Sequence, residues 1–205
     1  MQAQLLTALI GALAFAVAGL CGTLIATALI PALQPFEDGP PPYNVHPALL
    51  IAGAAVLGGF IGWREPPLLQ FAVSALSTVV LVAIWYCDAR TGFIPDWLTL
   101  LPLGLLLIYG VARHDWLMLI SAAVMFVPFA FIAFISKGRG MGWGDAKLAS
   151  LGGALVGMEM AAFGFTIATA IAVIVTRLRG HPKDVPIALG PYLVCAIAVA
   201  IVLQT

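Results

Sequence analysis

Apolar residues run in long blocks along this chain, and short polar turns separate the blocks. No charged residue occurs over 1–36, 39–63 or 66–87. Blocks of this length suit helices that cross the hydrocarbon core of a bilayer, which takes roughly 20 apolar residues. The pattern predicts membrane-crossing helices near residues 5–33, 47–62, 68–87, 97–112, 117–135 and 186–203.

Residues 146–176 allow two interpretations. They form either one over-long helix or a short segment to about Gly157, a turn at Met158 and Glu159, and a return helix. The outgoing segment of the second interpretation has about 12 residues and is roughly 18 Å long. It is too short for a full crossing, so it must be shielded by neighbouring helices or reach only partway.

The placement of basic residues distinguishes the two interpretations, because Lys and Arg concentrate on the cytoplasmic side of a membrane protein. With a return helix, the nine basic residues divide seven to two, and with one long helix they divide four to five. The seven are Arg90, Lys137, Arg139, Lys147, Arg177, Arg179 and Lys183, and the two are Arg64 and Arg113. We therefore predict the return helix, about eight membrane segments including one short segment, and both termini outside.

Composition supports an all-α polytopic membrane bundle that forms a single domain over residues 1–205. Hydrophobic residues make up 62% of the 205 positions and charged residues 9%, against about 25% charged in soluble domains. A soluble enzyme, a disordered chain and a nucleic-acid binder are thereby excluded. Isolated cysteines and histidines lack the spacing of a metal site, so no metal and no cofactor is expected. These residues are Cys21, Cys87, Cys195, His46, His114 and His181.

Two acidic residues stand out by their position at the ends of apolar blocks. Asp88 directly follows one block, and Asp145 comes just before another. Two crossings separate them, and an even number of crossings returns the chain to the same side of the membrane. Two carboxylates that share a site cannot both ionise cheaply, so they share one proton. The ionised partner can then take a proton from an attacking water while the protonated partner polarises a peptide carbonyl.

Simpler interpretations of both acids remain open from position alone. Asp145 is also suited to cap the helix that follows it, as Asp often does. Asp88 is also suited to pair with Arg90 in interfacial water.

Three motifs, in order, resemble those of the type IV prepilin peptidases, the membrane aspartyl peptidases with a Gly-x-Gly-Asp motif. The first runs from Asp88 through Pro95 to Thr99, and the second, Gly142-Trp-Gly144-Asp145-Ala-Lys147-Leu148, is similar to the family's Gly-x-Gly-Asp-x-Lys-Leu. The third contains Pro186, Gly190 and Pro191 and resembles a Pro-Phe-Gly-Pro-Phe-Leu element, although Ile187, Ala188 and Leu189 replace the Phe before the glycine. Together they span residues 86–193, and residues 1–67 supply N-terminal helices and loops.

The resemblance implies an aspartic endopeptidase with Asp88 and Asp145 as its catalytic residues. It implies cleavage of the N-terminal leader of prepilin or pseudopilin substrates at the cytoplasmic face of the inner membrane, with recognition of the substrate's apolar helix within the bilayer. Residues expected to bind substrate or to shape the site are Pro95, Gly142, Gly144, Lys147, Pro186, Gly190 and Pro191. Lys147 is expected near the two acids or near a lipid phosphate.

Longer bacterial members carry paired CxxC motifs between their first two helices, linked to methylation of the new pilin N-terminus. Here the interval 34–46 contains no cysteine. We therefore expect the short form, similar to peptidases of tight-adherence pili and to archaeal preflagellin peptidases, without methyltransferase activity.

Two other classes of function remain open. A protease of the presenilin or signal-peptide-peptidase type shares the loose pattern of Asp88, Gly142-Trp-Gly144-Asp145 and a late proline. A small proton-coupled transporter would use the acids as proton sites and would not cleave peptides.

Overall fold

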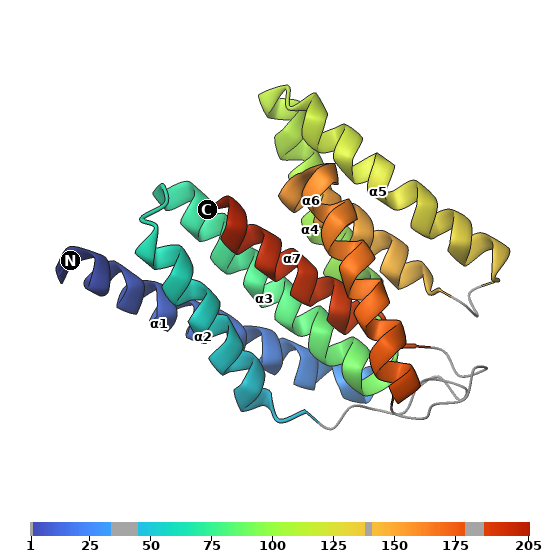
Figure 1. Cartoon of the computed structure of the whole chain (residues 1–205), viewed down its shortest axis with the longest axis horizontal. Helices are drawn as coiled ribbons and strands as arrows, with labels where there is room; N and C mark the ends of the chain where they lie inside the picture. Colours follow the sequence, from blue (N-terminus) through green and yellow to red (C-terminus); the bar gives the residue numbers. More distant parts are fainter. Residues whose placement is uncertain (1, 34–44, 138–140, 179–186) are drawn as a thin grey trace.

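The chain folds into a bundle of helices that run alongside one another (Figure 1). The computed structural model describes residues 2–33, 45–137, 141–178 and 187–205. These residues contain helices and no strand, which confirms the predicted all-α class. The helices are α1 (Gln2–Leu29), η1 (Ile30–Ala32), α2 (Pro47–Trp63), α3 (Leu68–Thr91), α4 (Asp96–Arg113), α5 (Trp116–Ile135), α6 (Trp143–Leu178) and α7 (Gly190–Gln204).

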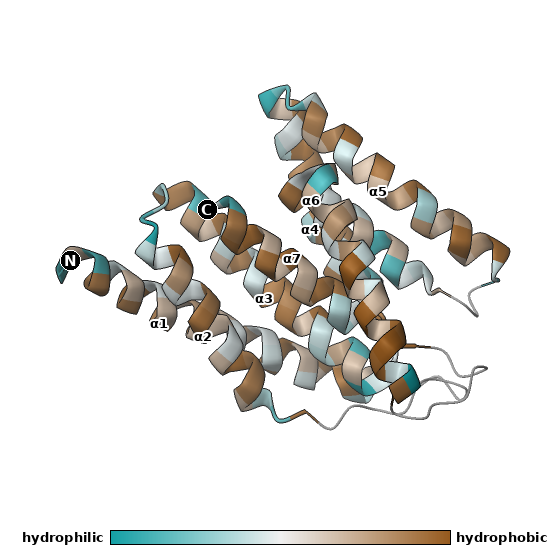
Figure 2. Cartoon of the chain, in the orientation of Figure 1, coloured by the Kyte–Doolittle hydropathy of each residue, from teal (hydrophilic) through white to brown (hydrophobic). Residues whose placement is uncertain are grey.

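Five helices in the described ranges are long and apolar enough to cross a membrane: α1 with η1, α3, α4, α5 and α6. Two further apolar helices, α2 and α7, are shorter, with 17 and 15 residues. Figure 2 shows apolar colour along the length of the helices and hydrophilic colour at several turns and helix ends. Many large apolar side chains of these helices are exposed, among them Leu13, Leu76, Ile108 and Phe134. Because apolar side chains face outward rather than being confined to a core, the surroundings must be lipid, and the protein is a multi-pass membrane protein.

Helix α6 is a hairpin of two arms rather than a straight rod. Gly157 has φ 75° and ψ 161°, a backbone conformation that is essentially confined to glycine. A Cβ on Gly152 would lie 2.6 Å from Cζ of Phe165, although thirteen residues of straight helix would separate the two positions by about 20 Å. Figure 1 shows the second arm returning beside the first. The predicted return helix is confirmed. With the two arms of α6 counted separately and η1 counted with α1, the described residues form eight helical segments.

Helices α1 and α2 pack closely against each other, and α3 packs against this pair. A Cβ on Gly58 would overlap both the carbonyl oxygen of Gly11 and the side chain of Phe15. Small residues allow helices in a membrane to approach closely, which increases van der Waals contact where no hydrophobic driving force exists. Gly22 of α1 faces α3 in the same way, because a Cβ there would lie 2.6 Å from the Val79 carbonyl oxygen. The α1–α2 pair therefore braces the helix that carries Asp88.

The start of the last helix differs from the prediction. The sequence predicts a helix from residue 186, whereas α7 begins at Gly190 and the described residues before it, 187–189, are not helical. Pro191 occupies the first turn, where its missing N–H costs no hydrogen bond and its fixed φ favours the helix. The motif proline Pro191 therefore marks the helix start, while Pro186 lies outside the described residues.

Candidate active site

Asp88 lies inside the last turn of α3, slightly deeper in the helix than the sequence predicts. The helix ends at Gly92, which adopts the left-handed conformation with φ 66°, and its N–H donates to the Asp88 carbonyl oxygen at 2.8 Å. Glycine is favoured here because it enters this conformation without a steric cost. Thr91 Oγ1 donates to the Cys87 carbonyl oxygen at 2.8 Å and secures the same turn. The Asp88 side chain is thereby held in the bundle, where the residue is 5% exposed.

Asp145 lies in the first turn of α6. Its Oδ2 accepts a hydrogen bond from the Gly142 N–H at 3.2 Å. A side chain in the first turn that reaches back to the N–H before the helix follows the logic of a capping box. Asp145 therefore stabilises the helix start, as the capping interpretation predicts, but it does so from inside the first turn and with a residue exposure of 8%. The capping contact occupies Oδ2 and fixes the orientation of the carboxylate.

The fold brings Asp88 and Asp145 together. Their carboxylates interact electrostatically, although 57 positions separate them in the sequence. The Gly190 N–H also interacts with the Asp88 carboxylate, yet no donor among the described residues makes a hydrogen bond of standard geometry to Asp88 Oδ2. A buried carboxylate oxygen without such a bond calls for a water or a ligand group at that position.

The start of α7 forms a third wall of this site. A Cβ on Gly190 would lie 2.6 Å from Oδ2 and 2.9 Å from Cγ of Asp88. Glycine at this position allows the backbone of α7 to lie against the carboxylate. The buried Pro191 follows directly, in the first turn of α7. Two of the three predicted residues of the last motif, Gly190 and Pro191, thus lie at the site or adjoin it.

The glycines of the second motif have separate structural roles. Gly142 donates its N–H to Asp145. Gly144 faces Ile94, since a Cβ on Gly144 would lie 3.0 Å from the Ile94 Cβ. The turn between α3 and α4 can therefore pack directly on the start of α6. Pro95 lies in the same turn and is the N-cap residue of α4, with φ −61° and ψ 130°.

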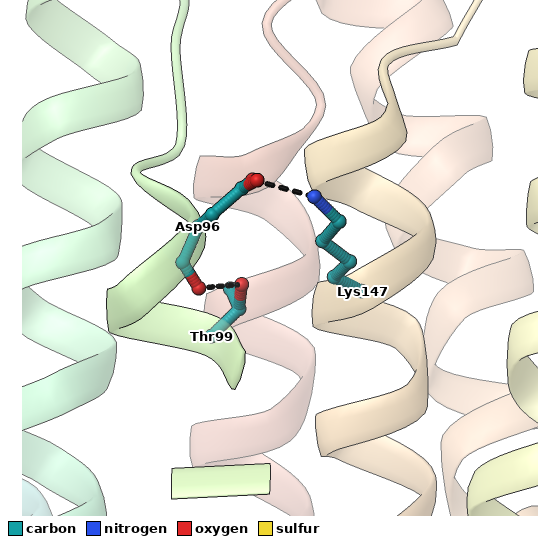
Figure 3. Close-up of polar contacts among 3 residues, drawn as sticks. All are labelled: Asp96, Thr99 and Lys147. Atoms are coloured by element: carbon teal, nitrogen blue, oxygen red, sulfur yellow. Dashed lines mark hydrogen bonds and ion pairs between the residues drawn. The ribbon is translucent and has the colours of Figure 1, made fainter. Parts of the chain in front are cut away.

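Lys147 contacts Asp96, an acid that the sequence analysis left without a role. The Nζ of Lys147 lies 2.5 Å from Oδ1 of Asp96 (Figure 3). This ion pair joins the first motif to the second. The signal was present in the sequence as opposite charges in the two motifs, but only the fold shows that these two positions face each other.

Arg90 does not pair with Asp88, contrary to the simpler interpretation of that acid. Its guanidinium donates to the Tyr86 hydroxyl at 3.3 Å and to the Val45 carbonyl oxygen at 3.5 Å. It also lies over the Tyr86 ring, 5.4 Å from the centroid. The positive charge of Arg90 is thus directed to the neighbouring aromatic ring and backbone.

The site consists of two buried carboxylates at the ends of membrane helices, with backbone of α7 against one of them. Nowhere in the described ranges do three His, Cys, Asp or Glu side chains group closely enough to hold a metal ion. Such a pair can accept, share and return a proton beside a polar substrate group. Fold and site together define a multi-pass membrane protein with a dicarboxylate centre.

Comparison with known proteins gives the family. The sequence profile of the type IV leader peptidase family matches residues 75–177, half of the chain, including both aspartates. The chain therefore belongs to the type IV leader peptidase family. It is 29% identical over 162 residues to the prepilin leader peptidase/N-methyltransferase of Pseudomonas aeruginosa, an alignment that covers 72% of this chain and 55% of that relative. The chain thus spans about half the length of this curated relative. No solved structure matches the chain significantly.

Proposed function

We propose that this protein is an aspartic endopeptidase that removes the N-terminal leader of prepilin-like proteins. The observation that carries the proposal is the pair Asp88 and Asp145, two buried carboxylates that interact across α3 and α6. The family and the relative's name support prepilin-like substrates. A substrate of this kind would present its own apolar helix to the bundle within the bilayer.

In the proposed reaction the two carboxylates share one proton and hold a water between them. The ionised carboxylate removes a proton from the water as the water oxygen attacks the peptide carbonyl carbon. The protonated carboxylate donates to the carbonyl oxygen, and a tetrahedral intermediate forms. The first carboxylate then passes its proton to the leaving amine, the C–N bond breaks, and the second takes back the proton from the intermediate's hydroxyl. No proton is gained or lost over the cycle, apart from ionisation of the products.

No described donor makes a hydrogen bond of standard geometry to Asp88 Oδ2, which supports a water at this position. A buried carboxylate oxygen is rarely left without a donor, and the capping bond of Asp145 Oδ2 directs that carboxylate without occupying its other oxygen. Gly190 has no side chain where its backbone faces Asp88, so no side chain of this residue would displace the attacking water.

The cytoplasmic side is the face we propose for the cleavage. Arg90 and Arg177 lie in the last turns of α3 and of the second arm of α6, at the same side as the aspartates by the count of crossings. Arg113 lies at the other end, in the last turn of α4. The basic excess on the aspartate side supports a cytoplasmic orientation in the inner membrane.

We propose leader removal without methylation of the new N-terminus. The three cysteines of this chain, Cys21, Cys87 and Cys195, form no CxxC pair. Cys87 is buried beside Asp88, and the other two are exposed on α1 and α7. They do not supply the paired cysteine motifs expected of the longer, methylating members.

Co-expression with a candidate prepilin tests the proposal, with leader removal followed by gel shift and the new N-terminus mapped by mass spectrometry. Asp88→Asn and Asp145→Asn should each abolish cleavage while the protein still inserts in the membrane. Glu159→Gln is the matched control, because it removes an exposed carboxylate of the same α6 helix and should process normally. Processing by both Asn variants would overturn the enzyme, and proton flux without cleavage would favour a transporter. A presenilin-like protease would instead cut within the substrate's apolar helix.

A further inference from the structure

An ion pair joins the starts of α4 and α6 beside the candidate site. Lys147 Nζ lies 2.5 Å from Asp96 Oδ1, and Figure 3 shows the two side chains pointing toward each other from neighbouring helices. The side chain of Lys147 is 20% exposed and that of Asp96 is 61% exposed. The contact thus lies where the bundle meets its polar surroundings.

A second contact lies next to the ion pair and is apolar. Ile94 is 4% exposed, and a Cβ on Gly144 would lie 3.0 Å from the Ile94 Cβ and 3.4 Å from Cγ1 and Cδ1. Ile94 precedes Asp96 by two positions, and Gly144 precedes Lys147 by three. The turn that follows Asp88 is therefore held on the start of α6 at two points.

The backbone on the α4 side is itself well fixed. Thr99 is fully buried, and its Oγ1 donates to the Asp96 carbonyl oxygen at 3.0 Å (Figure 3). Thr91 Oγ1 accepts from the Phe93 N–H at 3.2 Å and so shapes the chain between Asp88 and Ile94. Because both ends of this turn are fixed, a displacement of Asp96 should also displace the last turn of α3.

We propose that Asp96 and Lys147 are positioning residues that set the separation of the Asp88 and Asp145 carboxylates. Asp96 is connected to Asp88 through the fixed turn, and Lys147 follows Asp145 by two positions on the same helix. The ion pair therefore ties the two carboxylate-bearing helix ends to each other. The inference rests on the proposed peptidase function for its activity test, but not for its structural test.

The effect on activity should exceed the effect on folding. Exposed ion pairs contribute little to stability, because water screens them and their side chains lose freedom on pairing. A small displacement of one catalytic carboxylate is costly, since proton transfer and attack both need close alignment. Variants that lose this contact should therefore insert and fold but process slowly.

A double-mutant cycle in the cleavage assay tests the pair. Asp96→Asn and Lys147→Met should each lower kcat about threefold to tenfold with little change in KM. The double variant should be no slower than the slower single variant, because one contact is lost in all three. Lys147→Arg, which keeps the charge, should recover most of the rate. Losses that multiply in the double variant, or that appear in KM alone, would overturn the proposal.

Two control variants remove single charges elsewhere in the chain. Lys137→Met removes an exposed positive charge near the end of α5, and Glu159→Gln removes an exposed negative charge from α6. Both should process at the wild-type rate. Equal losses in the controls and in the pair variants would also overturn the proposal, since general charge would then explain the result.

A distance measurement tests, without any substrate, whether the Asp96–Lys147 ion pair holds the two helix starts together. Trp97 and Trp143 are 49% and 47% exposed at the starts of α4 and α6. Spin labels are attached to Trp97→Cys and Trp143→Cys in a background without the three native cysteines. EPR then measures the separation of the two helix starts. Asp96→Asn should broaden or shift the distance distribution, and Lys137→Met should not. An unchanged distribution in Asp96→Asn would overturn the positioning role. If the wild-type protein cleaves no prepilin but this shift occurs, the proposed function is wrong and the positioning role of the ion pair is supported.

Discussion

The backbone of Gly190 lies against the carboxylate of Asp88, so closely that a Cβ on Gly190 would lie 2.6 Å from Oδ2. The two residues are 102 positions apart in the sequence. This contact brings the start of α7 to the candidate site, and a single added methyl group at Gly190 is therefore a direct test of the site.

Gly190→Ala should lower leader processing by about 100-fold, because the added methyl group must displace either the Asp88 carboxylate or the start of α7. The measurement is the rate of cleavage in the co-expression assay or with purified protein. Gly104→Ala in α4 is the control, since nothing lies within 4 Å of its added Cβ. The control should keep full activity and gain up to about 1 kcal/mol of helix stability. Normal processing by Gly190→Ala would contradict the site as described.

The processing rate should pass through a maximum as pH is varied. Two carboxylates that share one proton lose activity when both are protonated and again when both are ionised, which gives a bell-shaped profile. The measurement is kcat/KM of the purified protein in detergent across the pH range of its stability. A rate that rises steadily with pH, with no fall on the alkaline side, would argue against a shared proton.

Gly157→Ala should destabilise the α6 hairpin by about 1–3 kcal/mol, because alanine is strained at φ 75° and ψ 161°. No atom lies within 4 Å of the added Cβ, so the cost comes from the backbone conformation and not from overlap. Thermal unfolding in detergent measures the change. Gly164→Ala in the second arm is the control, because its Cβ would meet Ala196 at an ordinary 3.4 Å. Equal Tm values for the two variants would contradict the turn at Gly157.

Gly58→Ala should lower the stability of the α1–α2 pair by about 1–3 kcal/mol through overpacking against Gly11 and Phe15. The neighbouring Gly59→Ala provides a matched control, since its Cβ would lie 3.7 Å from the Ala12 Cβ, an ordinary contact. Both variants change glycine to alanine in the same turn of α2. A difference in Tm between them therefore measures packing and not helix propensity.

Cysteine labelling in intact cells should place Lys137 and His114 on opposite sides of the membrane. Each would be changed to Cys and exposed to a membrane-impermeant maleimide, in a background without the native cysteines. Helix α5 (Trp116–Ile135) separates the two positions, and the basic residues predict that His114 is outside. Labelling of His114→Cys alone is the expected result. Labelling of Lys137→Cys alone would reverse the orientation and move the candidate site to the outer face.

The apolar blocks predicted the helices well because lipid imposes one simple rule, that a crossing needs a long stretch without charge. The same rule, through the parity of crossings, predicts that Asp88 and Asp145 lie on one side of the membrane. Helix ends were less predictable. Helix α3 continues past Asp88 to Thr91 because the glycine at 92, and not the first charge, ends it.

Contacts between motifs could not be predicted from the sequence. The Asp96–Lys147 ion pair and the approach of Gly190 to Asp88 both depend on how helices rotate and pack. Helix rotation depends on small differences between similar apolar faces, as on α3 and α7, where no strong polar stripe fixes the orientation. The motifs therefore predicted the candidate site residues, while the packing determines which of them touch.

The short first arm of α6 has a consequence for the surrounding bilayer. Residues 143–157 extend about 22 Å, whereas the hydrocarbon layer is about 30 Å thick, so the reversal at Gly157 stops below the far headgroups. The Val156 carbonyl oxygen there accepts from Gln204 Nε2 at 2.6 Å, which provides a donor that acyl chains lack. The bilayer beside this hairpin must become thinner, or water must enter it above the turn. The thickness of the surrounding membrane should therefore affect the stability of the contact between the two arms.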